Sequence, residues 1–386
     1  MGLIIIFLAG ILLGLLTGFL PGIHPNLVAS LLAQTTFLED EKALLLVGMA
    51  SVNLVASFIL AIFFGIPDES VVVSILPGQK LTLAGRGLTA LRISLVSMVL
   101  AAAVSLTLFE PAIWFYPQIY AMLSDYIKYI VLLLAVLMIV KSKKPLIAAV
   151  VFAAAGLLGF YSFHMMLPDP FLPLFSGMFA LASLVNITKT KLPKQEKEEA
   201  LERKIIPYIF LGVLFGFLAD LLPGISSPAQ IALFVGILIF LEPLEYLSLI
   251  SAVGVSQAMF SFATAATIEK ARIGTTVWLS KITDVSQQPF FFAVLFFFGL
   301  IVAATILYCL RKNISVMATL NSPLIAGVLI AYIAIVCFLI DGWVGLMIMV
   351  LGGILGWLTV QLNVERTQLM GAVVVPTLLL LFRIFL

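Results

Sequence analysis

The chain is built from long apolar runs separated by short polar connections. The run from Phe290 to Leu310 carries no charged residue, and about 20 such residues suffice to cross a hydrocarbon core roughly 30 Å thick as a helix. Because the runs are continuous rather than alternating, and because backbone groups in lipid must be bonded within their own segment, they predict helices. The other long runs are 3–19, 43–64, 93–109, 129–140, 145–161, 171–187, 205–222, 246–268, 320–340, 343–360 and 369–386.

Composition supports a membrane protein. The chain has 386 residues, of which 63% are hydrophobic and 10% are charged, with a mean hydropathy of +1.23. No basic residue precedes the first run, so we expect it to remain a spanning helix and not a cleaved signal peptide. These features predict an all-α, multi-pass protein of the cell membrane with about 11 to 12 spanning or re-entrant helices.

Charge divides the chain near its midpoint. Residues 188–204 form a linker with six Lys or Arg and four Glu, and it separates an N-terminal membrane half, 1–187, from a C-terminal one, 205–386. Its cationic excess predicts a cytoplasmic location, which Lys141–Lys144, Arg86, Arg92 and Arg311 should share. The net charge of +2 and the absence of a basic stripe argue against nucleic acid as a partner. Cys309 and Cys337 both lie inside apolar runs, which is typical of small core residues and not of a disulfide or metal pair.

Two Pro-Gly elements, one in each half, are related in sequence. Residues 10–26 read GILLGLLTGFLPGIHPN and residues 212–230 read GVLFGFLADLLPGISSPAQ. With one residue inserted in the second copy, Pro25 aligns with Pro228 and the triplet 37–39 (Phe-Leu-Glu) aligns with 240–242. The short runs 27–38 and 229–241 then form the second arms of two broken-helix hairpins. The charge distribution gives the two copies opposite orientations, and paired broken helices in inverted repeats indicate a transporter binding site near the bilayer midplane.

The breaks have a chemical use. Proline lacks the N–H that closes a helical turn, and glycine permits the backbone angles that follow. A helix N-terminus exposed at such a break carries partial positive charge and attracts anions. Asn26 and either Ser226 or Ser227 could cap the two second arms. The predicted substrate-binding residues at the breaks are Pro21, Gly22, His24, Asn26, Pro223, Gly224, Ser226 and Ser227.

Other polar residues lie within apolar surroundings. Asn53 and Gln257 follow the two hairpins at near-equivalent distances and are predicted to bind substrate, although amides also join helices structurally. Asp220 immediately precedes the second break and could bind Na⁺ or carry a proton, because an acid inside the membrane is costly. The adjacent pair Asp68 and Glu69 is a second candidate for the coupling ion. Asp341, at a run boundary, is expected to be an interfacial anchor.

The sequence resembles the TctA family, the large membrane subunit of tripartite tricarboxylate transporters. The first Pro-Gly element is similar to the family's glycine-rich signature. The block 63–91, FFGIPDESVVVSILPGQKLTLAGRGLTAL, is similar to its Ile-Pro element, small-residue run, turn and basic glycine-rich stretch. The resemblance is strongest over residues 10–92. The chain departs from the family in its shorter length and in Asp68-Glu69 where a Gly-Thr-like pair is usual, which identifies a short, divergent branch.

The residues and the resemblance together predict a secondary transporter of a small organic anion. The expected substrate is a di- or tricarboxylate, coupled to Na⁺ or H⁺ and moved by alternating access. A small membrane subunit, an extracytoplasmic binding protein and a second copy of the chain are candidate partners, and no cofactor is expected. The alternatives are a transporter of anionic lipid headgroups such as polyprenyl phosphate, for which Arg86, Arg92 and Arg272 would matter, and a non-transporting subunit of a complex. No protease or phosphate-binding motif supports an enzyme.

Overall fold

The computed structural model is all-helical over the residues it describes, which are 2–20, 25–33, 35–64, 75–187, 193–195, 198–221, 241–271, 273–320 and 322–384. The helices of the first half are α1 (Gly2–Phe19), α2 (Pro25–Ala33), α3 (Glu39–Ile59) with a π-helical end (Leu60–Phe64), α4 (Ile75–Leu83), α5 (Gly87–Thr107), α6 (Phe109–Leu123), α7 (Ile127–Val140), α8 (Pro145–His164), α9 (Phe171–Phe175), a π-helical stretch (Ser176–Leu181) and α10 (Ala182–Ile187). Those of the second half are α11 (Ile206–Ala219), α13 (Pro243–Ile268), α14 (Gly274–Ile282), α15 (Pro289–Leu320), α16 (Ser322–Gln361) and α17 (Gly371–Leu381). Short 3₁₀ turns lie at Arg203–Ile205, Val285–Gln287 and Arg366–Met370.

The prediction of an all-α, multi-pass membrane protein is confirmed. By length and composition, seven helices among the described residues can cross a membrane, and the bent pair of α6 and α7 raises this number to eight. Two shorter apolar helical stretches, Phe171–Leu181 and Arg366–Leu381, add to these. The predicted runs 320–340 and 343–360 are joined in α16, where Gly342 has non-helical angles (φ 64°, ψ −157°).

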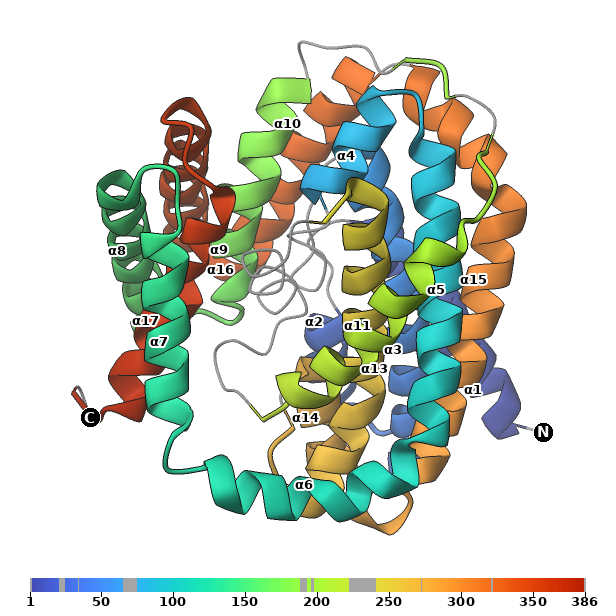
Figure 1. Cartoon of the computed structure of the whole chain (residues 1–386). Coiled ribbons are helices and arrows are strands. Elements are labelled where there is room, and N and C mark those ends of the chain that lie inside the picture. Colours follow the sequence, from blue (N-terminus) through green and yellow to red (C-terminus); the bar gives the residue numbers. More distant parts are fainter. Residues whose placement is uncertain are drawn as a thin grey trace.

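The helices pack as two groups that lie side by side in Figure 1. The A group contains α1 to α5, α11 and α13 to α15, and the B group contains α7 to α10, α16 and α17. Helix α6 packs against α5 and α13 and runs beneath the A group toward α7 in Figure 1. Both halves of the sequence contribute to each group, since the earlier helices of each half enter the A group and the later ones enter the B group.

Each Pro-Gly element joins two helices that run parallel. Added side chains at Gly10 and Gly14 of α1 would meet the backbone of Leu45 and Met49 on α3. Gly212 and Gly216 of α11 face Leu249 and Val253 of α13 in the same way. Two consecutive parallel helices require a connection that returns along them. In the first copy this connection includes α2, whose 9 residues span only about 14 Å.

A second glycine-mediated pairing occurs in the B group. Gly156 and Gly159 of α8 pack against Val375 and Ala372 of α17. Gly353 and Gly356 of α16 pack against Leu181 and Met178. The spacing within each pair is three residues and the partner order is reversed in both. The contacts of α8 with α17 and of α16 with the π-helical stretch Ser176–Leu181 are therefore matching antiparallel contacts. Small residues permit this close approach of helices in membranes.

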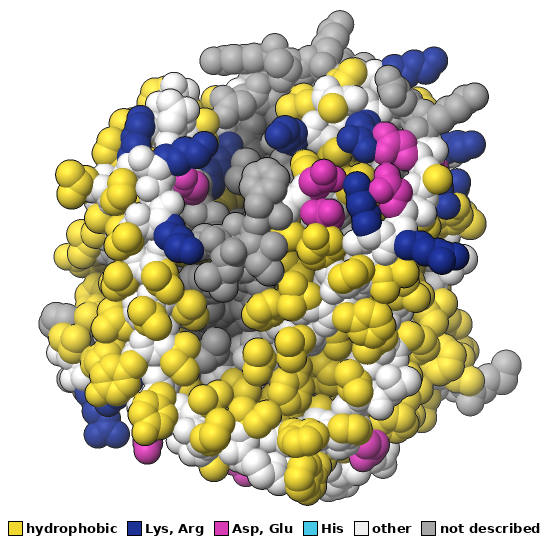
Figure 2. Space-filling view, in the orientation of Figure 1, with side chains coloured by type: hydrophobic (Ala, Val, Ile, Leu, Met, Phe, Trp, Pro, Cys, Tyr) yellow, Lys and Arg dark blue, Asp and Glu magenta, His cyan; other side chains and the backbone are white. Residues whose placement is uncertain are grey.

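The helices after the two Pro-Gly elements point in opposite directions. The π-helical end of α3 lies against the last turn of α4, where the Thr82 hydroxyl donates to the carbonyl of Ile62 (2.7 Å). The start of α13 lies at this same end of the molecule. Glu242, at the start of α13, pairs with Lys204 of the linker, and Glu199 of the same linker pairs with Arg86, just before α5. Figure 2 shows that Lys and Arg side chains gather at this end on the visible face, above a broad apolar surface.

Candidate functional site

The first helix pair places a neutral polar contact next to the first break. Asn53 of α3 donates from Nδ2 to the Thr17 hydroxyl of α1 (3.1 Å), and the Thr17 hydroxyl in turn donates to the carbonyl of Gly14. Asn53 and Thr17 are 4% and 8% exposed. Asn53, which the sequence predicts as a binding residue, is therefore held by the helix that leads into the break.

The second pair places a carboxyl group at the corresponding depth. Asp220 caps the C-terminal end of α11, and its Oδ1 accepts from Gln257 Nε2 (3.1 Å) while its Oδ2 accepts from the Thr264 hydroxyl (2.8 Å). All three side chains are 0% exposed. The side chains of Gln257 and Thr264 are neutral, and an acid inside a membrane segment is costly to bury and is usually functional.

Further contacts join α6 to α11 and α5 to α13 near Asp220. The Tyr116 hydroxyl of α6 donates to the carbonyl of Phe217 (2.8 Å), and the two rings stack with centroids 4.4 Å apart. The Ser105 hydroxyl of α5 donates to the Ser256 hydroxyl of α13 (2.9 Å). Thr264, Tyr116 and Ser256 were not among the predicted site residues, because only the three-dimensional packing brings them to α11.

Asn53 and Gln257 occupy equivalent positions. Each lies 15 residues after the N-cap of its helix, Leu38 for α3 and Glu242 for α13. Both N-caps carry the same reciprocal hydrogen bond, from Leu38 N to Glu41 and from Glu242 N to Glu245. In the alignment of the two Pro-Gly elements, which pairs Gly10 with Gly212, Asp220 corresponds to Gly18, so the acid is present in one copy only.

Asn26 meets a helix of the other half. A side chain added to Gly274 would collide with the Asn26 side-chain amide. Because Asn26 lies in the first turn of α2 and Gly274 is the first residue of α14, two helix N-termini converge here. Thr276, in the same first turn of α14, is 1% exposed. The sequence predicted Asn26, and Ser226 or Ser227, as caps of two helix N-termini and did not indicate α14.

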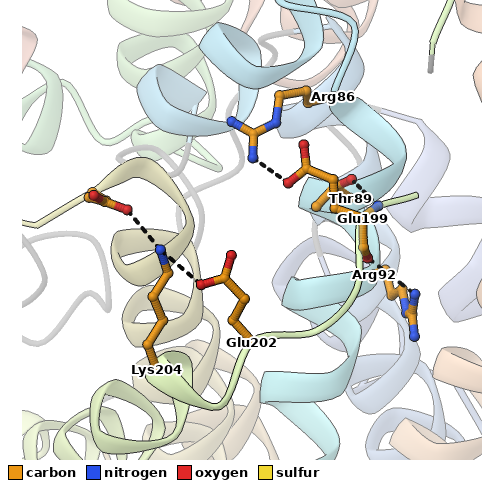
Figure 3. Close-up of polar contacts among 7 residues, drawn as sticks. Arg86, Thr89, Arg92, Glu199, Glu202 and Lys204 are labelled. Carbon is orange, nitrogen blue, oxygen red and sulfur yellow. Dashed lines mark hydrogen bonds and ion pairs between the residues drawn. The ribbon is translucent and has the colours of Figure 1, made fainter. Parts of the chain in front are cut away.

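The linker ties the charged ends of the A group together. Figure 3 shows Arg86 reaching Glu199, the Glu199 backbone N–H donating to the Thr89 hydroxyl, and Lys204 between Glu202 and a second carboxylate, that of Glu242. Hydrogen bonds with Glu202 and Glu242 raise the pKa of Lys204. We call residues 193–204 of the linker the strap, as far as the structure describes them.

Glu198 of the strap joins both halves. Its carboxylate pairs with Arg92 of α5 (3.7 Å) and with Arg311 of α15. Nearby, Gln195 Oε1 accepts from the backbone N–H of Gly87 (2.8 Å). A side chain at Gly87 would press on this oxygen and on Phe63, which explains the glycine-rich turn at 85–87. The structure thus brings Arg86, Arg92 and Arg311 to one end of the molecule, as the charge pattern predicts.

Several predicted residues lie outside the described residues. These are Pro21, Gly22, His24, Asp68, Glu69, Pro223, Gly224, Ser226 and Ser227, together with Arg272. Of the predicted site, Asn26, Asn53, Asp220 and Gln257 are described, and they contact α14, α1 and α13 as given above. No group of three or more His, Cys, Asp or Glu that could hold a metal occurs among the described residues.

Multi-pass helices, two sequence-related breaks and a buried acid beside one of them define a polytopic membrane protein of the transporter class. The profile of the Tripartite tricarboxylate transporter TctA family matches residues 4–208, and the chain belongs to this family. It is also similar to the Uncharacterized protein MJ1079 of Methanocaldococcus jannaschii, with 28% identity over 193 residues, which cover 47% of this chain and 48% of that protein. The chain thus spans about half the length of the curated relative it matches. No solved structure matches the chain.

Proposed function

We propose that the chain is a permease for a small organic anion, a di- or tricarboxylate, driven by a Na⁺ or H⁺ gradient. Membership of the TctA family gives the general class. The observation that carries the coupled mechanism is the fully buried Asp220, held by Gln257 and Thr264 and three residues before Pro223 in the sequence. Such an acid inside a membrane segment is costly to keep and is usually functional.

The anion would bind where helix N-termini converge. The contact between Asn26 of α2 and Gly274 of α14 supports this placement, because a helix N-terminus carries partial positive charge. Asn53 lies on α3, which packs against α2. The Pro-Gly residues 21–22 and 223–224, with His24, Ser226 and Ser227, complete the proposed substrate site.

The two halves would act as inverted repeats. Three features support this proposal: the matched parallel pairs α1–α3 and α11–α13, the opposite directions of α3 and α13, and the matched glycine contacts in the B group. Two repeats inverted about the bilayer midplane permit one outward-facing and one inward-facing arrangement of similar energy. Alternating access would then move one helix group past the other, with Asp220 occupied in one arrangement and released in the other.

Uptake by the purified chain tests the proposal. Proteoliposomes should accumulate labelled citrate or a smaller carboxylate when a Na⁺ or proton gradient is imposed, and the gradient that works identifies the ion. Accumulation would show that the chain transports alone. Uptake that appears only after addition of an extracytoplasmic binding protein or a small membrane subunit would place it in a tripartite system. Absence of uptake from folded protein under all these conditions would overturn the proposal.

The lipid-phosphate alternative is less well supported. It would use Arg86 and Arg92 to bind the headgroup, but Glu199 and Glu198 of the strap engage these arginines. Uptake that persists when Arg86 and Arg92 are replaced would favour the carboxylate reading.

A further inference from the structure

The break in α16 holds a second buried acid, away from Asp220. Asp341 immediately precedes Gly342, the non-helical residue of α16, and its side chain is 7% exposed. The side chain therefore lies inside the protein and not on its surface. Its Oδ1 accepts from the backbone N–H of Asp169 (3.0 Å), in the connection between α8 and α9.

Asp169 is itself part of the local structure. Its Oδ1 accepts from the backbone N–H groups of Phe171 and Leu172, both at 3.2 Å, so it caps the start of α9. The Ser162 hydroxyl of α8 donates to the carbonyl of Pro170 (3.1 Å). The carboxyl group of Asp341 therefore links the break in α16 to the start of the α9 segment.

One oxygen of Asp341 is left over. Its Oδ2 is buried and has no hydrogen-bond partner among the described residues. The titratable groups that face it are Asp169 and, one turn earlier on α16, the buried thiol of Cys337. The nearest histidine in sequence, His164 at the end of α8, is turned toward Phe160 of its own helix. No ion pair between described residues includes Asp169 or Asp341.

Two neighbouring carboxyl groups without a cation do not both ionise readily, because the second charge is opposed by the first and by burial. A proton on Asp341 Oδ2 would convert the unpartnered acceptor into a donor and remove this conflict. A metal ion is a poorer occupant, since the described residues offer no set of three metal-binding side chains.

We propose that Asp341 and Asp169 form a proton-binding site that holds the α8–α9 connection against the break in α16. With the proton bound, Asp341 accepts from Asp169 N and carries no net charge. When the proton leaves, the buried carboxylate of Asp341 is opposed by the neighbouring, half-buried Asp169, and the connection is released from α16. The site belongs to the B group and does not depend on the proposed carboxylate transport.

Thermal unfolding of the purified chain from pH 5, just above the pKa of an ordinary aspartate, to pH 9 tests the site. A proton that the folded chain holds and the unfolded chain releases makes stability fall as pH rises. The wild-type midpoint should therefore fall by roughly 2 °C per pH unit more than that of Asp341→Asn. This variant keeps the acceptor for Asp169 N and replaces the O–H by an amide donor, so it should remain folded.

Asp284→Asn is the matched control. Asp284 is exposed and its pKa is lowered by hydrogen bonds from the Ser286 side chain and backbone, so this variant should keep the wild-type slope over the tested range. Equal slopes for wild type and Asp341→Asn would overturn the proposal. A stabilisation by Na⁺ over choline at equal ionic strength that Asp341→Asn abolishes would also overturn it, in favour of a cation site.

A hydrophobic carbodiimide, which attacks protonated carboxyl groups, identifies the residue. At pH 7, peptide mass spectrometry should find Asp341 or Asp169 labelled on the order of 10-fold more than Asp284, because an ordinary aspartate is almost fully ionised there. Labelling should decline toward pH 9 and disappear from residue 341 in Asp341→Asn. The proposal would be overturned if Asp169 and Asp341 were labelled no more than Asp284 and the unfolding slopes were equal, because the pair would then hold no proton.

Discussion

At the scale of single residues, the two copies of the repeated element differ in where they carry an acid. Gly18 packs against Ala56 in the first copy, whereas Asp220 takes the equivalent place in the second and meets Gln257. The amides Asn53 and Gln257 are retained in both. The acid confined to one copy is therefore our candidate for the coupling ion.

Replacement of Asp220 by Asn should separate coupling from binding. Asn keeps an acceptor for Gln257 but cannot carry a proton or balance a cation, so gradient-driven accumulation should fall to background. Exchange of labelled for unlabelled substrate across the membrane should persist, because the substrate site at α2 and α14 is unchanged. Thr264→Ser, which preserves the hydroxyl, should accumulate substrate as the wild type does. Full accumulation by Asp220→Asn would remove this residue from the coupling site.

A methyl group at Gly274 should weaken substrate binding. The added carbon would displace the Asn26 side chain, and we expect KM to rise roughly 10-fold, equivalent to about 1.4 kcal/mol. The maximal rate should change little, because no coupling residue is touched. Gly327→Ala is the control, since a side chain there meets nothing within 4 Å. An unchanged KM in Gly274→Ala would exclude Asn26 and α14 from the site.

At the scale of helices, the sequence was informative where polar residues interrupt apolar runs. The Pro-Gly breaks, Asp220 and the near-equivalence of Asn53 and Gln257 were all predicted from such interruptions. Their partners Thr17 and Thr264 were not, because a hydroxyl in an apolar run commonly bonds its own helix backbone and gives no signal of a distant contact. The glycine pairs 156/159 and 353/356 were also missed, since glycine spacing alone does not identify the helix that packs on it.

The strap offers a prediction at this scale. Glu198 is 12% exposed in its side chain and pairs with Arg92 and Arg311, so Glu198→Gln should lower stability by about 1–3 kcal/mol. We expect a thermal midpoint several degrees lower.

Glu202→Gln is the comparison for the strap. The side chain of Glu202 is 60% exposed and pairs with Lys204, which also forms an ion pair with Glu242. Its replacement should therefore cost less than about 0.5 kcal/mol, as exposed ion pairs contribute little. Equal losses in the two variants would show that Glu198 does not tie the halves together.

At the scale of the whole molecule, the division of the sequence at the linker differs from the division in space. The halves 1–187 and 205–386 each supply helices to both groups, so neither group is a sequence half. Hydropathy cannot reveal this arrangement, because a lipid-facing helix and a helix buried between groups are equally apolar. The proposed transport cycle follows from the spatial division, with the A and B groups as the moving parts.

A thiol cross-link between the groups should therefore stop transport. Leu60, in the π-helical end of α3, shares a buried apolar cluster with Leu184 of α10 in the B group. With Cys309 and Cys337 replaced by Ser, the pair Leu60→Cys and Leu184→Cys should lose uptake when joined by a short bifunctional thiol reagent with a reducible link, and a reductant should restore it. The pair Tyr129→Cys and Phe382→Cys lies within the B group, where the two rings are 5.9 Å apart, and its cross-link should be tolerated. If confirmed cross-linking of the first pair left uptake intact, the groups would not move past each other at α3 and α10, and the change of access would have to occur within the A group, at the hairpins themselves.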